Sequence, residues 1–264
     1  MSTITPRAGS VANEIGKGLL DLVTGWREMV IQMITFPVFY LLIVLFIGRG
    51  QLRADLLAPV LIGMVALTFI HEQVNRVFWS YQGDIQSGVL EQTYLTPLPS
   101  ALRILGRQVS AAVAALPTAL SVLATGYVAI ALNGGRLAFD VRILVPVTAI
   151  AVGTGGLALI LCGLTLVYKR IAIITQVSVA VYAIAGGTLV PLTSMPGWTA
   201  TLSRLFVPIA PGIEAMRNIL LTGPHSGWGP AWLLLQPVLL LGIGVAVFTA
   251  LERLARKRGT LGRY

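Results

Sequence analysis

Long apolar runs separated by short polar segments dominate the chain. An α-helix needs about 20 apolar residues to cross the hydrocarbon core of a bilayer, and six runs come close to or reach that length. We expect each run to form a membrane-spanning helix, although helix can continue from the second run through His71-Glu72-Gln73-Val74. The predicted spans are Ile31–Gly48, Leu56–Ile70, Val109–Leu132, Ile143–Tyr168, Ile171–Val190 and Ala231–Leu251.

The segment before the first run has helical periodicity. Its apolar residues recur at spacings of three or four, and charged residues occupy the positions between them. Asn13 is a suitable N-cap. We therefore predict an amphipathic helix over residues 13–30 that lies in the membrane interface; the alternative is an ordinary helix packed on a soluble partner. The periodic residues are Ile15, Leu19, Leu22, Trp26, Met29 and Met33.

The loop between the second and third runs, residues 75–108, is longer than a simple connection requires. Asp84 can cap a short helix that runs to about Leu95 and ends before Pro97. A loop of this length with its own helix indicates a docking surface, and a solvated connector is the alternative.

The segment before the last run, residues 191–230, is apolar but interrupted by prolines. It is too interrupted to span the membrane and too apolar to lie free in water. We predict short helices that dip into the outer leaflet and act as an outer gate, with their backbone buried in protein or lining a cavity. Glu214 and Arg217 are three residues apart and can pair on one helix face. The gate residues are Pro191, Met195, Pro196, Pro208, Pro211, Glu214 and Arg217.

Composition agrees with this pattern. Hydrophobic residues make up 56% of the chain and charged residues 11%, whereas soluble domains contain about 25% charged residues. The mean hydropathy is +0.83. We predict an all-α polytopic membrane protein with one transmembrane domain, residues 1–264. Its parts are the interface helix (13–30), spans one to five (31–190), the outer segment (191–230), span six (231–251) and a tail (252–264).

The net charge of +9 carries topological information. Thirteen of the 19 Lys and Arg residues lie in the segments that share one side with the termini. Because cytoplasmic loops are enriched in Lys and Arg, we expect both termini and loop 75–108 in the cytoplasm. The basic residues form no patch with interleaved aromatics, so nucleic acid is not an expected partner.

Catalytic and nucleotide-binding motifs are incomplete. A phosphate-binding loop around Lys17 would need Gly at position 11 and Ser or Thr at position 18, where Val11 and Gly18 stand. His71-Glu72 begins a zinc motif that lacks its second histidine, because Asn75 takes that place. We expect no metal site, no cofactor and no enzymatic activity in this chain. His71 and Glu72 are interface residues or part of a cytoplasmic gate.

Two segments carry a family resemblance. One is Ser87–Pro99 (SGVLEQTYLTPLP), and the other is Gly187–Trp198 (GTLVPLTSMPGW) followed by Pro208–Arg217 (PIAPGIEAMR) and LLTG at 220–223. In this order, and with six spans and both ends inside, they resemble the membrane (permease) subunit of type-2 ABC transporters of the exporter class. The resemblance covers nearly the whole chain.

The resemblance implies a multi-pass protein of the bacterial inner membrane that pairs with a second copy or homologue. Two cytoplasmic ABC ATPase subunits would bind ATP and Mg and drive export of a drug, lipid or glycan. An ion-coupled secondary transporter or channel is the alternative. The helix between spans two and three would be the coupling helix, with Ile85, Val89 and Leu90 as apolar anchors. Its implied residues are Asp84, Ile85, Ser87, Gly88, Val89, Leu90, Glu91, Gln92, Thr96 and Pro97.

Overall fold

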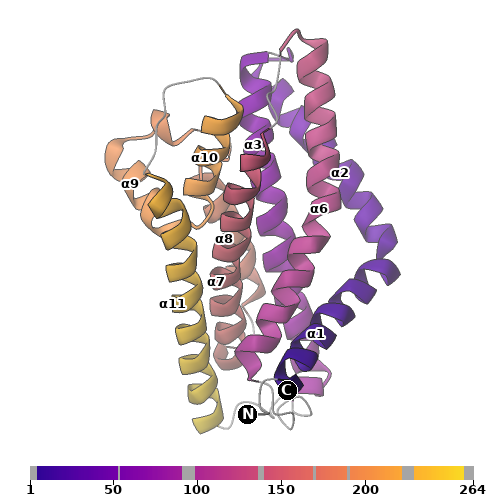
Figure 1. The fold of residues 1–264 in the computed structure, drawn as a ribbon, viewed down its shortest axis with the longest axis vertical. Coiled ribbons are helices and arrows are strands. Elements are labelled where there is room, and N and C mark those ends of the chain that lie inside the picture. Colours follow the sequence, from indigo (N-terminus) through magenta and orange to yellow (C-terminus); the bar gives the residue numbers. More distant parts are fainter. Residues whose placement is uncertain are drawn as a thin grey trace.

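The computed structural model describes residues 5–52, 54–90, 99–135, 140–168, 171–188, 191–221 and 229–258. Over these ranges the chain is helical with connecting turns and contains no strand, which confirms the all-α class. The helices form an elongated bundle (Figure 1). They are α1 (Thr5–Thr24), α2 (Trp26–Ile47), α3 (Ala54–Ile70), α4 (Arg76–Gln86), α6 (Ser100–Leu132), α7 (Leu144–Tyr168), α8 (Ala172–Ala185), α9 (Gly197–Phe206), α10 (Ala210–Leu220) and α11 (Pro230–Lys257), with a π-helical turn η1 (His71–Asn75) and 3-10 turns at Val141–Ile143 and Leu192–Ser194.

Five helical stretches in the described ranges are long and apolar enough to cross a membrane, which indicates a multi-pass membrane protein. They are Trp26–Ile47, Leu56–Gln86, Ser100–Leu132, Val141–Tyr168 and Ala231–Lys257. The predicted fifth span coincides with α8, which has 14 residues and is therefore about 21 Å long. That length is short of the roughly 30 Å hydrocarbon core. The helix ends at Gly186-Gly187, where Gly187 has a φ of +79°.

The second span is longer than its apolar run. Helix α3 continues through η1 into α4 as one helical stretch, Leu56–Gln86. Residues 71–82 contain neither glycine nor proline, so nothing in the local sequence interrupts the helix where its apolar character ends.

The N-terminal helix begins and ends elsewhere than the periodicity predicts. It starts at Thr5, so Asn13 lies inside α1 and is not its N-cap, and a break at Gly25 separates α1 from α2. Helix α1 packs on α6 through Gly18, where an added Cβ would lie 2.1 Å from Ser110 Oγ. Leu20 and Val23 remain exposed, so α1 keeps an apolar surface that the bundle does not cover.

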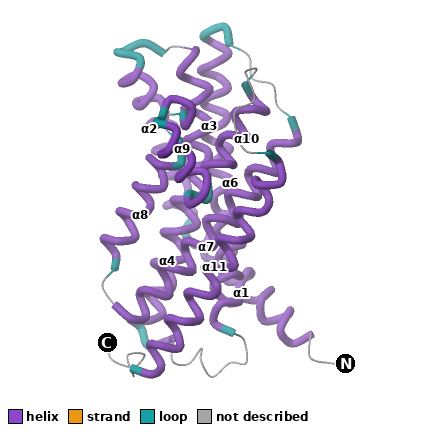
Figure 2. Tube along the Cα trace, turned by 90° about the vertical axis from the view of Figure 1, so that its left-hand side faces the viewer, coloured by secondary structure: helices purple, strands orange, loops and turns teal. Residues whose placement is uncertain are grey.

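The two ends of the bundle differ in structure. Helices α9 and α10 lie at one end, while α1 and the last turns of α11 lie at the other (Figure 1). The view turned by 90° shows the same separation along the long axis (Figure 2). The end near α1 contains the last turn of α4 and the first turn of α6, and the opposite end contains the short helices α9 and α10.

Helices α7 and α11 pack closely through glycine. A Cβ added at Gly156 would lie 2.4 Å from the Leu240 carbonyl oxygen, and one at Gly244 would lie 2.5 Å from the Gly156 oxygen. The two backbones therefore touch, as small residues allow in membrane helix pairs.

We expect Gly244→Ala to destabilise the protein by about 1–3 kcal/mol, because the new methyl group must push α7 and α11 apart. Gly242→Ala is the matched control on the same helix, since a Cβ there meets nothing within 4 Å, and alanine is a better helix former than glycine by about 1 kcal/mol. Thermal unfolding in detergent measures both variants. Equal transition temperatures would contradict the close contact.

Candidate functional site

The short helix predicted to begin at Asp84 does not begin there. Asp84 lies in the last turn of α4 and does not cap a new helix, which corrects the prediction. Helix α4 ends because the Ser87 hydroxyl donates to the Gly83 carbonyl oxygen at 2.8 Å and Gly88 has a φ of +73°, a conformation that suits glycine after a helix C-terminus. Helical conformation resumes at Val89 and Leu90.

The apolar side chains of this segment divide into two groups. Ile85 and Leu90 are buried and belong to a small core with residues of α4, α6, α7 and α11. They are therefore not free to anchor a partner, which corrects that part of the prediction. Val89 is 41% exposed, and its role as an anchor stays a prediction. The remaining predicted coupling residues, Glu91, Gln92, Thr96 and Pro97, lie outside the described residues.

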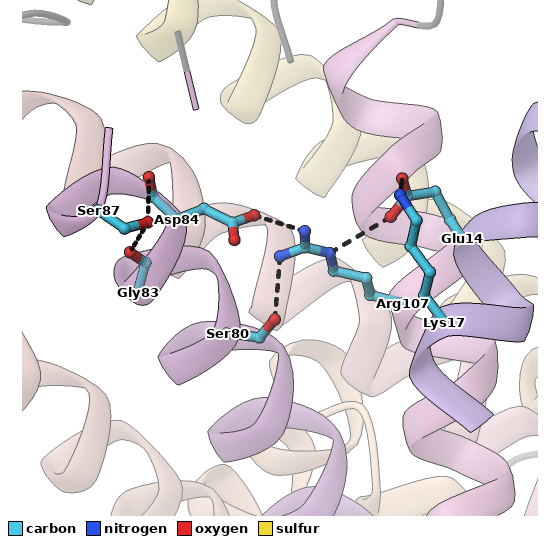
Figure 3. Close-up of polar contacts among 7 residues, drawn as sticks. All are labelled: Glu14, Lys17, Ser80, Gly83, Asp84, Ser87 and Arg107. Carbon is cyan, nitrogen blue, oxygen red and sulfur yellow. Dashed lines mark hydrogen bonds and ion pairs between the residues drawn. The ribbon is translucent and has the colours of Figure 1, made fainter. Parts of the chain in front are cut away.

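A cluster of charged side chains fixes the base of this segment. Arg107 of α6 forms an ion pair with Asp84 at 2.5 Å and donates to Ser80 Oγ at 3.0 Å, both on α4. Its Nε lies 3.7 Å from a carboxylate oxygen of Glu14 on α1, and Glu14 also pairs with Lys17 at 3.4 Å. Figure 3 shows the guanidinium between the two carboxylates. We call Glu14, Ser80, Asp84 and Arg107 the Arg107 cluster.

The geometry of the Arg107 cluster joins three helices at one point. Ser80 and Asp84 are four residues apart and therefore share a face of α4. The forked guanidinium donates to both while also facing α1. The side chains of Arg107, Asp84 and Glu14 are only 18%, 22% and 13% exposed, so water screens their attraction only in part. A displacement of the end of α4 is thereby linked to α1 and α6.

At the opposite end of the bundle, a second ion pair joins α9 to α10. Arg204 donates to both carboxylate oxygens of Glu214 at 2.7–3.1 Å, with side chains that are 17% and 7% exposed. These hydrogen bonds hold the pKa of Arg204 above its usual value, against the opposing effect of burial. Glu214 was predicted to pair with Arg217, and this prediction is corrected: the ion pair of Glu214 is with Arg204 because the turn after Phe206 folds α9 back onto α10.

Arg217 instead fixes α10 to the bundle. It donates to the carbonyl oxygens of Gly187 at 2.7 Å and Pro59 at 3.2 Å, which belong to the turn after α8 and to α3. Burial lowers the pKa of Arg217 to about 10, so it remains cationic at neutral pH. The outer segment is thus attached to the same helical stretch that carries Asp84 at its other end.

The prolines shape the short helices, whose presence in this segment was predicted and is confirmed. Pro196 is the N-cap residue of α9, and Pro211 lies in the first turn of α10, where its fixed φ suits the helix. Pro208 lies in the connection between them, 2.7 Å from where a Cβ of Gly153 would stand. Pro191 precedes the 3-10 turn, and Met195 is partly buried against the main core.

The other two predicted site residues, His71 and Glu72, begin the π-helical turn. Glu72 is 3% exposed and pairs with Arg76 at 3.2 Å. His71 contacts the Phe36 ring edge-on at 5.3 Å between centroids, and its Nδ1 lies 3.2 Å from Asn75 Nδ2. Such π-helical turns often occur at functional sites.

Polar side chains of this turn connect neighbouring helices. Gln73 donates to the Ala151 carbonyl oxygen of α7 at 3.2 Å and accepts a hydrogen bond from Thr154. Asn75 accepts from Gln176 of α8 at 2.9 Å. These contacts join the middle of the long helix to both α7 and α8.

Sequence reasoning missed Glu14, Arg107, Arg204 and the polar links of η1 because each contact joins residues on different helices. The one local signal was the spacing of Ser80 and Asp84, which places two acceptors on one face of α4.

The chain matches neither a protein-family model nor a curated protein in the comparisons made. Function is therefore inferred from the residues and contacts of the chain itself.

Proposed function

We propose that this chain is the membrane subunit of a type-2 ABC exporter. It forms, with a second membrane subunit, a path for a hydrophobic or amphipathic cargo, and ATP hydrolysis on two separate cytoplasmic subunits drives transport. In this proposal α8 is the fifth of six spans and α11 the sixth, α1 lies in the cytoplasmic interface, and α9 and α10 dip into the outer leaflet of the bacterial inner membrane. Both termini are cytoplasmic.

The observation that carries the proposal is the Arg107 cluster at the base of the Ser87–Pro99 segment. A docking segment transmits force only if its base is rigidly attached to a span. Helix α4 continues from α3 as one stretch of 31 residues, and Arg107 braces its end against α6 and α1. Movement of the segment by an ATPase would therefore tilt the whole second span.

A second feature supports a paired membrane subunit. Helix α8 exposes most of its apolar residues and buries only Thr175 and Val179. An exposed apolar helix face in a spanning position needs either lipid or another helix against it. We assign this face to the second subunit and to the path between the two. The exposed residues are Ile173, Ile174, Val177, Val181 and Ile184.

The contacts also give a route from the inner to the outer end. Tilting of the α3–α4 stretch would move Pro59, whose carbonyl oxygen accepts from Arg217 of α10. It would also move Asn75, which is bonded to Gln176 of α8. Closure of the ATPases at the inner end would thus move the outer segment and α8, the helix that faces the partner subunit.

Transport by the reconstituted complex tests the proposal. The chain is placed in liposomes alone and with a candidate ABC ATPase from the same cell, and uptake of a fluorescent amphiphilic drug is followed with and without ATP. We expect ATP-dependent transport only in the pair. Transport driven by an ion gradient in the absence of the ATPase would refute it.

Topology gives an independent prediction. Ser87 directly follows α4 and Ser194 lies in the turn before α9, and both are exposed. The two helices lie toward opposite ends of the bundle (Figure 2). The native Cys162 is fully buried, so it adds no background labelling. In intact cells we expect Ser194→Cys to react with a membrane-impermeant maleimide and Ser87→Cys to react only after the cells are opened. The opposite pattern would reverse the orientation.

One observation favours the ion-coupled alternative. Glu72 lies within a helix of spanning length, and its Oε1 is buried without a hydrogen-bond partner among the described residues. Ionisable groups at such positions often belong to ion or proton pathways. Glu72→Gln in the same liposomes separates the two functions: it should abolish gradient-driven transport in a secondary transporter but leave ATP-driven transport largely intact in the exporter.

A further inference from the structure

A groove between α6 and α7 opens sideways from the bundle. Its cavity volume is about 400 Å³, within the range of about 300–1,000 Å³ found for small-molecule sites. The walls are almost entirely apolar, and the buried residues Phe69 and Gln73 also line it. We call it the α6–α7 groove, and its main lining residues are Val109, Val113 and Leu116 of α6 and Val147, Val152 and Gly155 of α7.

The polar groups of the groove are satisfied with one exception. Gln73 is bonded to Ala151 and Thr154, and the Thr148 hydroxyl donates to the Val145 carbonyl oxygen at 2.8 Å. Gln108 is different. It is 6% exposed, and neither Oε1 nor Nε2 has a hydrogen-bond partner among the described residues.

A buried amide without partners is costly, so such groups are usually bonded to something. Gln108 lies against Gly155, where an added Cβ would come within 3.3 Å of its Cγ. The glycine therefore leaves room for the amide at the wall of the groove. A ligand in the groove would meet the donor NH2 group and the acceptor carbonyl oxygen of this amide and mainly apolar side chains elsewhere.

We propose that the α6–α7 groove binds a single-chain amphiphile from the bilayer, with an amide, ester or alcohol group hydrogen-bonded to Gln108. Val109, Val113 and Leu116 are each partly open to the outside of the bundle, so the ligand enters from the hydrocarbon core. From Gln108 to Leu116 the wall extends by roughly 12 Å along α6, which accommodates an extended apolar chain. None of the lining residues belongs to α8, and the proposal does not depend on an ATPase.

Photo-crosslinking tests this site. The full chain in nanodiscs is exposed to two probes with the same diazirine-bearing sixteen-carbon chain, one ending in a primary amide and one in a methyl group. We expect the amide probe to label peptides of α6 and α7 about five- to tenfold more than the hydrocarbon probe, the difference that one neutral hydrogen bond contributes.

Three variants locate the interaction. Gln108→Leu should remove the preference for the amide, whereas Gln82→Leu, which replaces another largely buried glutamine outside the groove, should retain it. Ala112→Phe fills the groove from α6 and should reduce labelling by both probes.

Equal labelling by the two probes in the wild type, or an amide preference that survives Gln108→Leu, would overturn the proposal. Cross-linking of Val113→Cys to a second subunit, with no labelling by either probe, would also overturn it, because a protein surface would then cover the groove.

Discussion

Replacing Glu214 by glutamine is expected to lower the free energy of unfolding by about 3–5 kcal/mol, the usual cost of leaving one member of a buried ion pair without its partner. Both oxygens of Glu214 accept from Arg204, and the two side chains are 17% and 7% exposed. The neutral amide keeps the shape of the side chain but leaves the guanidinium charge largely uncompensated. Tryptophan fluorescence during thermal unfolding in detergent measures the loss, and Trp232 reports locally because its Nε1 donates to the Arg204 carbonyl oxygen.

A double replacement separates the effect of charge from that of packing. Arg204→Met should destabilise by a similar amount, because it leaves Glu214 buried and unpaired. Arg204→Met combined with Glu214→Leu should recover most of the loss, since apolar side chains of similar volume often replace a buried ion pair with little cost.

The exposed ion pair Arg142–Asp140 provides the control. Its side chains are 82% and 44% exposed, so Arg142→Ala should change stability by less than about 1 kcal/mol. An equally small effect for Glu214→Gln would show that the outer segment is open to water and not folded as a closed pair of helices.

The sequence predicts the apolar spans because a bilayer requires long stretches of one kind of residue. The apolar cores of α2, α3, α6, α7 and α11 were recognised for this reason. The full length of the second span was not recognised, because its last four turns carry polar residues that a hydropathy pattern assigns to a loop. Absence of glycine and proline over residues 71–82 was the better guide to where the helix continues.

Contacts between helices were less accessible to sequence reasoning. The rule for residues three or four apart favoured a pair between Glu214 and Arg217, but it applies within one helix. The turn between α9 and α10 brings Arg204 to Glu214 across ten positions, and Arg107 reaches Glu14 across ninety-three. Such pairs depend on how the helices pack, which no local spacing specifies.

The predicted start of a coupling helix at Asp84 was wrong for a related reason. Aspartate favours an N-cap only where the preceding chain has left the helix. Here the chain leaves the helix at Ser87 and Gly88, so Asp84 serves as an acceptor for Arg107 instead. Whether residues 91–97 form a coupling helix stays a prediction, because they lie outside the described residues.

Removing the acceptor on α4 is expected to uncouple ATP hydrolysis from transport. In the proposed complex, Asp84→Asn leaves the helix and the Ser87 cap intact but breaks the ion pair that braces α4 against α6. We expect transport to fall by about tenfold or more while ATP hydrolysis continues, because the segment then moves without tilting the second span. Protein stability should fall by only about 1–2 kcal/mol, since the pair is partly open to water.

The matched variant Glu14→Gln distinguishes bracing from a general loss of charge. Glu14 lies 3.7 Å from Arg107, farther than Asp84, and on α1 rather than on the proposed lever. Its replacement should leave the number of cargo molecules moved per ATP close to the wild-type value. A similar loss in both variants would indicate that the Arg107 cluster acts as one electrostatic unit and not through α4.

A second measurement does not depend on the identity of the ATPase. A nitroxide attached at Gln86→Cys, an exposed position in the last turn of α4, reports the mobility of the end of α4 directly and leaves the Ser87 cap in place. We expect its spectrum to show faster motion with Asp84→Asn and little change with Glu14→Gln. If mobility rises with Asp84→Asn but coupling is unchanged, the Arg107 cluster braces the helix without transmitting force. If neither changes, the turn at Gly88 is held by the small core around Ile85 and Leu90, and the lever begins there.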